Sequence, residues 1–149
     1  MEIDIKKRQQ TLLTLWFAML MSIGSFFLFS RFLAPENSNE PGNATSDRLI
    51  VILMALGTFL VIVSFVVKRK FLERSVEKQD ISLVHTGFVI AWAICEVSAL
   101  LGVLERFLIG NGEYYLLFLL AAAGTAFHFP RRDHLLAASY KTSLNGAAS

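Results

Sequence analysis

The chain has 149 residues, of which 54% are hydrophobic and only 17% are charged. This balance is far more apolar than that of an ordinary soluble domain, and a formal net charge of +2 does not indicate a nucleic-acid partner. The single cysteine, Cys95, excludes an intramolecular disulfide, and it has no neighbouring cysteine or histidine that would complete a metal-binding motif. We therefore expect a membrane protein without a metal or another cofactor.

The apolar residues are gathered in four blocks. Residues 9–30 contain 22 residues without a charge, 49–67 contain 19, 81–104 contain 24 with one glutamate, and 114–130 contain 17. About 20 helical residues cross the roughly 30 Å hydrocarbon core, and the blocks lack the alternating polarity of barrel strands. The expected fold is an all-α membrane protein with four transmembrane helices in an up-down bundle, at about residues 11–33, 49–70, 81–109 and 114–129.

The placement of basic residues predicts the orientation of these helices. Eleven of the 14 Lys and Arg residues lie before the first block, between the second and third, or after the fourth. Short loops rich in Lys and Arg stay cytoplasmic. Both termini, the loop 71–80 and the tail 130–149 are therefore expected on the cytoplasmic side of a bacterial inner membrane, and the loop 34–48 on the outer side.

The lipid bilayer is the expected partner, and other membrane subunits or a second copy of the chain could pack beside it. Basic clusters next to a membrane helix attract anionic lipid headgroups. Five residues at the cytoplasmic helix ends are candidates for such contacts: Lys68, Arg69, Lys70, Arg131 and Arg132.

Small residues predict how the third and fourth segments pack. The turn Gly110-Asn111-Gly112 is so short that these segments should form an antiparallel hairpin. One face of the third segment carries a stripe of small residues: Ala91, Cys95, Ser98 and Gly102. Small residues let membrane helices approach closely, so we expect the stripe to pack against the run 121–126 of the fourth segment.

Glu96 lies near the middle of the third segment, where a charged carboxylate costs at least about 2.5–3.5 kcal/mol. No Lys or Arg lies at a comparable depth in any block, and removal from water disfavours the charged form. We therefore expect a carboxyl that is protonated much of the time. The candidate polar partners are Ser22, Ser25, Thr58, Thr125, His85 and His128.

The two histidines have a particular place among these candidates. His85 shares a helical face with Glu96 but lies about 16 Å away along the axis, so a relay between them would need water or a third group. His128, near the end of the fourth segment, lies at a similar depth to His85, and the two could meet.

Nucleotide-binding, nucleophile-elbow and zinc-protease motifs are missing from the sequence, and the segments outside the apolar blocks are short. These features argue against an enzyme. The leading hypothesis is an accessory or scaffold subunit of a membrane complex, with Glu96 as an interhelical hydrogen-bond donor. The alternative is a proton-coupled transport component in which Glu96 titrates.

Residues 93–104 read AICEVSALLGVL, with an alanine and an aliphatic residue before the glutamate, an alanine three residues after it and a glycine three residues further on. This run resembles the carboxylate helix of the rotary ATP synthase proteolipid (c) subunit, which implies that Glu96 carries a proton or a sodium ion. The resemblance covers 12 of the 149 residues. The whole layout is also similar to small uncharacterised bacterial four-helix membrane proteins with an acid in the third helix and a Pro-Arg-Arg ending, a similarity that implies no activity.

Overall fold

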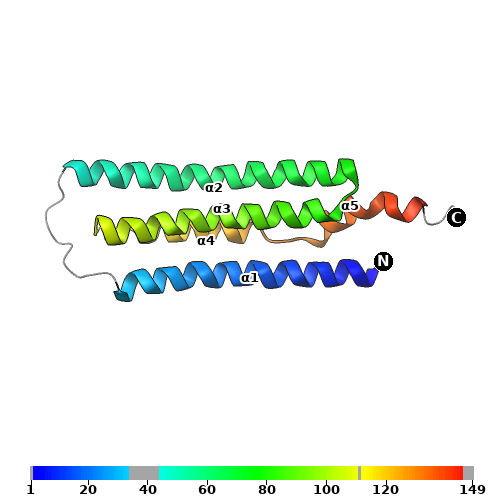
Figure 1. Ribbon diagram of the computed structural model, residues 1–149, viewed down its shortest axis with the longest axis horizontal. Helices are drawn as coiled ribbons and strands as arrows, with labels where there is room; N and C mark the ends of the chain where they lie inside the picture. The colour runs from blue at the N-terminus through cyan, green and yellow to red at the C-terminus, as the bar shows by residue number, and fades with distance from the viewer. Residues whose placement is uncertain (1, 34–43, 111, 146–149) are drawn as a thin grey trace.

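The chain folds into α-helices in the computed structural model, which describes residues 2–33, 44–110 and 112–145. The helices of this part of the chain are α1 (Glu2–Leu33), α2 (Ala44–Lys78), α3 (Ile81–Leu108), α4 (Tyr115–Phe127) and α5 (Arg132–Asn145). α1, α2 and α3 lie side by side and alternate in direction (Figure 1). We call the end with the N-terminus, the α2–α3 junction and α5 the terminal end, and the end with the α3–α4 turn the turn end.

Within the described ranges, three helices are long and apolar enough to cross a membrane: Ile5–Leu33, Ser46–Lys78 and Ile81–Leu108. A helix suits such a segment because its backbone N–H and C=O groups pair within the segment, where hydrocarbon offers no partner. Large apolar side chains on α1 and α2 point away from the protein, as at Phe17, Val51 and Phe59. The expected all-α architecture is confirmed, and these three helices indicate a membrane protein.

Helix extends into four segments expected to lie outside the spans, the first being residues 2–10 at the start of α1. α2 begins at Ala44, inside the expected loop 34–48, and continues through the expected loop 71–80 to Lys78. There Arg69 Nε donates to Glu73 Oε1 at 2.9 Å, a pairing that stabilises a solvated helix by about 0.2–0.5 kcal/mol. The expected tail 130–149 contains α5. Residues 34–43 and 146–149 lie outside the described residues.

The fourth apolar block forms a shorter helix than the expected span 114–129. α4 has 13 residues and ends at Phe127, so its length of about 20 Å is less than the thickness of the hydrocarbon core. Pro130 explains the early end, because a proline disfavours helical backbone at the residue before it. An extended segment then leads along α3 toward α5 (Figure 1).

The two tight connections of α3 follow from local sequence. Asp80 caps the start of the helix, where its carboxylate accepts from the N–H of Ser82 at 2.8 Å. At the other end Gly110 adopts a φ of 72°, which glycine does without a steric penalty, and its N–H donates to the Glu105 carbonyl at 3.2 Å. These two reversals place α3 antiparallel to both α2 and α4.

α3 is the central helix and contributes to two buried clusters. Both also contain residues of α1, which joins them along the bundle. The cluster at the terminal end consists of Ile5, Leu12, Val84, Phe88, Trp92, Leu135 and Ala138. The cluster at the turn end consists of Ile23, Ala99, Tyr114, Phe118 and Ala121.

Candidate functional site

Glu96 makes one interhelical hydrogen bond, with Ser22 of α1. The Ser22 hydroxyl donates to Glu96 Oε1, and both residues are half-buried. The sequence-based hypothesis of Glu96 as a hydrogen-bond donor stays a prediction, because a protonated carboxyl could donate to the same hydroxyl. An acceptor oxygen needs no proton, so this contact forms in either protonation state. Glu96 therefore links α3 to α1 near the middle of the bundle.

Two other hydroxyls that were candidate partners bond within their own helices. Ser25 donates to the carbonyl of Met21 and Thr58 to that of Met54, each at 2.8 Å. This bond to the carbonyl four residues earlier satisfies a hydroxyl that has no partner on another helix. Both residues are exposed, and neither contacts Glu96 in this way.

The two histidines lie in different surroundings. His85 is half-buried in the first turns of α3, whereas His128 is fully buried directly after α4. Within the described ranges, no hydrogen bond joins either histidine to Glu96 or to the other. In this part of the chain Glu96 therefore has no direct hydrogen-bonded link to a histidine.

His128 belongs to a polar cluster between α2, α3 and the end of α4. Its Nε2 lies 2.8 Å from Ser64 Oγ, and the Cys95 thiol donates to the same oxygen at 3.4 Å. The Ser64 hydroxyl donates to the Val61 carbonyl at 2.6 Å, which leaves the oxygen to accept from Nε2–H of the histidine. All three side chains are fully buried. Sequence reasoning did not select Ser64, although a serine inside an otherwise apolar helix was the available signal.

Two tryptophans satisfy carbonyl groups at the end of α4. Nε1 of Trp92 in α3 donates to the His128 carbonyl at 3.2 Å, and Nε1 of Trp16 in α1 donates to the Thr125 carbonyl at 2.8 Å. The last carbonyls of a helix have no partner within it, and hydrocarbon would supply none. The two indoles thus allow α4 to end inside the bundle. Thr125, expected near Glu96, takes part in this arrangement through its backbone.

The small-residue stripe packs against two helices rather than one. Its members are all buried: Ala91, Cys95, Ser98 and Gly102. A Cβ on Gly102 would lie 2.9 Å from Phe118 Cε2 of α4, while a Cβ on Gly57 of α2 would lie 2.9 Å from Ser98 Oγ. The hairpin argument anticipated α4 but not α2, because nothing in the sequence orients the glycine of α2 toward the stripe.

The five basic residues proposed to contact lipid headgroups divide into two groups. Four of them are exposed: Arg69, Lys70, Arg131 and Arg132. Lys68 is half-buried, and its Nζ lies 5.6 Å from the ring centroid of Phe88 and 5.8 Å from that of Phe65. A cation within about 6 Å of a ring centroid is attracted to the ring. Lys68 therefore contributes to the packing of α2 on α3.

His134, near the start of α5, is a titratable group outside the apolar blocks. Its ring centroid lies 5.8 Å from that of Phe88. Burial lowers the pKa of His134 below its usual range, and the positive charges of Lys68 and Arg131 lower it further, against an opposing effect of Asp133. The docked α5 therefore favours the neutral imidazole.

In the part of the chain that the structure describes, no group of three or more His, Cys, Asp or Glu residues is placed to hold a metal ion. Comparisons with protein-family models, with curated proteins and with solved structures found no match. The resemblance of residues 93–104 to a proteolipid helix therefore stays a prediction from sequence.

Proposed function

We propose that this chain is a four-span inner-membrane protein with both termini in the cytoplasm, and that it serves as an accessory or scaffold subunit of a membrane complex. The orientation is supported by the concentration of Lys and Arg at the terminal end. The fourth crossing consists of α4 and the extended segment 128–131. Non-helical backbone is tolerated at membrane depth where protein covers it, and the buried His128 and Pro130 support such a crossing.

The observation that carries the proposed role is the environment of Glu96. Its carboxyl accepts from Ser22 between two packed helices, and both residues are half-buried. A proton carrier needs water or a chain of titratable groups to reach either side of the membrane. A single serine supplies no such path, so the carboxyl acts as a link between α1 and α3.

The outward face of α2 supports the accessory part of the proposal. It carries large exposed apolar side chains along its length, including Val51, Phe59 and Ile62. An apolar helix of another subunit packs on such a face through side-chain contacts, and lipid tails cover whatever remains.

Substitution of Glu96 separates the structural role from proton transport. Glu96→Gln keeps the acceptor oxygen, so stability in mixed detergent should stay within about 0.5 kcal/mol, whereas Glu96→Ala should lower it by about 0.6–2 kcal/mol. Ser22→Ala should cost the same as Glu96→Ala, and the double variant no more than either. Proton uptake into vesicles that contain the purified protein, if lost in Glu96→Gln, would establish transport instead.

Partner binding is tested with a photo-crosslinking residue placed at Phe59 of α2 or, as the control, at Phe17 of α1, both exposed. In native membranes Phe59 should give one discrete adduct with another protein, and Phe17 should give lipid adducts. Lipid adducts alone at both positions would contradict the accessory-subunit role.

A further inference from the structure

Lys68 and Arg131 are the residues at which two apolar segments of the chain end. Lys68 is the first charged residue after the apolar block 49–67, and Arg131 is the first after the apolar block 114–130. The second of these blocks leads into α5, which contacts α2 and α3 at the terminal end (Figure 1). A basic residue that directly follows an apolar run in a membrane reaches the level of the lipid headgroups. We therefore expect both cations at that level.

The surroundings of Lys68 connect it with the start of α5. Its Nζ lies 5.6 Å from the ring centroid of Phe88, and the His134 ring of α5 lies 5.8 Å from the same centroid. Arg131 directly precedes α5, and its carbonyl accepts from the N–H of His134 at 3.3 Å. The positive charges of Lys68 and Arg131 both act on the His134 ring. The two cations thus belong to one cluster, although they are more than 60 residues apart in the chain.

Neither cation has a counter-ion in the part of the chain that the structure describes. Lys68 and Arg131 form no ion pair within those ranges. Asp133 is the acid nearest to Arg131 in sequence, and it acts on His134 without forming an ion pair with either cation. The docked α5 favours the neutral imidazole of His134, which adds no charge. Because Lys68 is half-buried, it loses hydration without compensation by an acid, and the pair therefore attracts an anion.

We propose that Lys68 and Arg131 together bind the phosphate of one anionic phospholipid, and that the bound phosphate holds the start of α5 against α2. An ammonium group binds phosphate as a point charge, and a guanidinium group binds two of its oxygens. The half-buried Lys68 distinguishes this pair from the other three basic residues considered for headgroup contacts, which are exposed. The inference rests on the proposed membrane insertion, but it does not depend on the role of Glu96 or on a partner subunit.

The surface next to the two cations favours a lipid over a free anion. Large apolar side chains are exposed in the last residues of the apolar segment before each cation: Phe65, Val66, Phe127 and Phe129. An anionic phospholipid places its phosphate at the cations and its acyl chains on such side chains. A free anion uses only the cations and leaves the apolar surface unchanged.

The test measures lipid binding by native mass spectrometry of the delipidated full-length protein, with dioleoylphosphatidylglycerol, dioleoylphosphatidylcholine or glycerol phosphate added. The anionic lipid should bind more tightly than the zwitterionic one. Arg131→Gln and Lys68→Gln should each weaken the anionic lipid about fivefold, since one basic residue near the headgroups contributes about 1 kcal/mol. Lys68→Arg keeps the charge and should retain binding. Lys70→Gln removes an exposed charge of the same helix, and as the matched control it should have no effect.

Two results of this experiment would overturn the proposal: equal binding of the two lipids, or the same loss of binding in Lys70→Gln as in Arg131→Gln. Full competition by glycerol phosphate would assign the two cations to a free anion instead. Insertion is measured separately, by flotation of the unmodified protein with liposomes of the same lipids. A protein that does not float would contradict the membrane location itself, whereas a protein that floats and binds both lipids equally contradicts only the phosphate site.

A second measurement tests the link between the lipid and α5. Saturating dioleoylphosphatidylglycerol at pH 7.5 should slow hydrogen exchange of the α5 amides relative to those of α3, because the phosphate fixes Arg131 at the start of the helix. The same lipid should not slow this exchange in Arg131→Gln, where the link to α5 is lost. Tight binding of the anionic lipid with unchanged exchange in α5 would show that the phosphate does not hold this helix.

Discussion

The glycines of α2, α3 and α4 lie at close helix contacts, whereas the glycine of α1 faces open space. A Cβ on Gly57 would lie 2.4 Å from Leu117 Cδ2, and a Cβ on Gly124 would lie 3.0 Å from Cys95 Sγ, so these glycines are needed for the approach of α2, α3 and α4. On the other side, a Cβ on Gly24 of α1 would touch nothing within 4 Å. α1 therefore packs on the unit of α2, α3 and α4 through residues of both buried clusters but leaves open space at Gly24.

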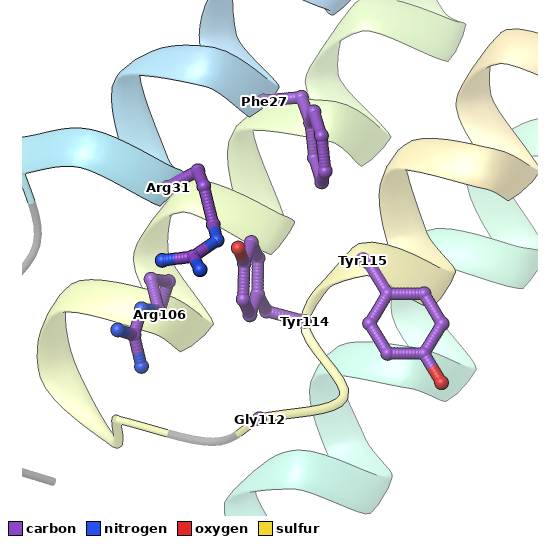
Figure 2. Close-up of a pocket in the computed structure, with 6 residues that line it drawn as sticks. All are labelled: Phe27, Arg31, Arg106, Gly112, Tyr114 and Tyr115. Carbon is purple, nitrogen blue, oxygen red and sulfur yellow. The ribbon is translucent and has the colours of Figure 1, made fainter.

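This difference in packing determines where open space remains between the helices. Side chains that interdigitate leave no room for a ligand, whereas α1 joins the unit through the Ser22–Glu96 bond, the Trp16 indole and the ring of Phe27 against Phe118, 5.6 Å apart. Beside these contacts lie an apolar groove of about 340 Å³ between α1 and α4, with Leu20, Gly24 and Leu119 in its lining, and a pocket of about 370 Å³ at the turn end (Figure 2). Two pairs of matched substitutions test the contrast.

The largest effect is expected at the tryptophans. Trp92 is fully buried in the packed unit, while Trp16 is half-buried on α1. Trp92→Ala should lower the free energy of unfolding by about 3–5 kcal/mol, because it opens a cavity and leaves the His128 carbonyl without its donor. Trp16→Ala should cost about 1–2 kcal/mol. The measurement is the shift in unfolding midpoint in mixed micelles of mild and denaturing detergent. An equal loss of stability in the two variants would show that Trp16 of α1 is packed as closely as Trp92 of α3.

A smaller effect is expected at the glycines. Gly57→Ala places a methyl group against Leu117 and Ser98, and such overpacking typically costs about 1–3 kcal/mol. Gly24→Ala meets no atom and replaces a flexible residue within a helix, so it should be neutral or stabilising by up to about 1 kcal/mol. The same unfolding measurement applies. Destabilisation by Gly24→Ala as large as that by Gly57→Ala would mean that α1 packs more closely than its contacts indicate.

The helices could be predicted from sequence because uncharged runs of about 20 residues have few alternatives in a membrane. The stripe of small residues on α3 could be predicted too, since its spacing of 4, 3 and 4 residues defines a face. Helix ends were less predictable: the continuation of α2 through its charged residues to Lys78 was expected, but its start at Ala44 was not, and the effect of Pro130 on α4 is local.

The partners of the polar side chains could not be predicted from the sequence. Glu96 is conspicuous because a carboxylate is rare at that depth, but its partner could have been any of several hydroxyls, and only the packing of α1 selects Ser22. Ser64 and His128 are 64 residues apart and are joined by the way α2 meets the end of α4. That Arg31 and Arg106 line the same pocket likewise depends on the alignment of α1 with α3, which no pattern in either helix specifies.

The smallest predicted effect concerns α5. This helix contacts both α1 and α3, because Leu135 and Ala138 pack with residues of these two helices. The pKa of His134 is lowered when α5 is docked, by burial first and then by nearby cations, so the undocked state binds the proton more readily. Docking is therefore most stable above the ordinary histidine pKa of about 6.5 and weakens as the pH falls below it. Hydrogen exchange of the α5 amides, corrected for intrinsic rates, should be faster relative to α3 at pH 5.5 than at pH 7.5. His134→Gln should remove this difference and His85→Gln should keep it; an unchanged pH dependence in His134→Gln would show that another group controls the docking of α5.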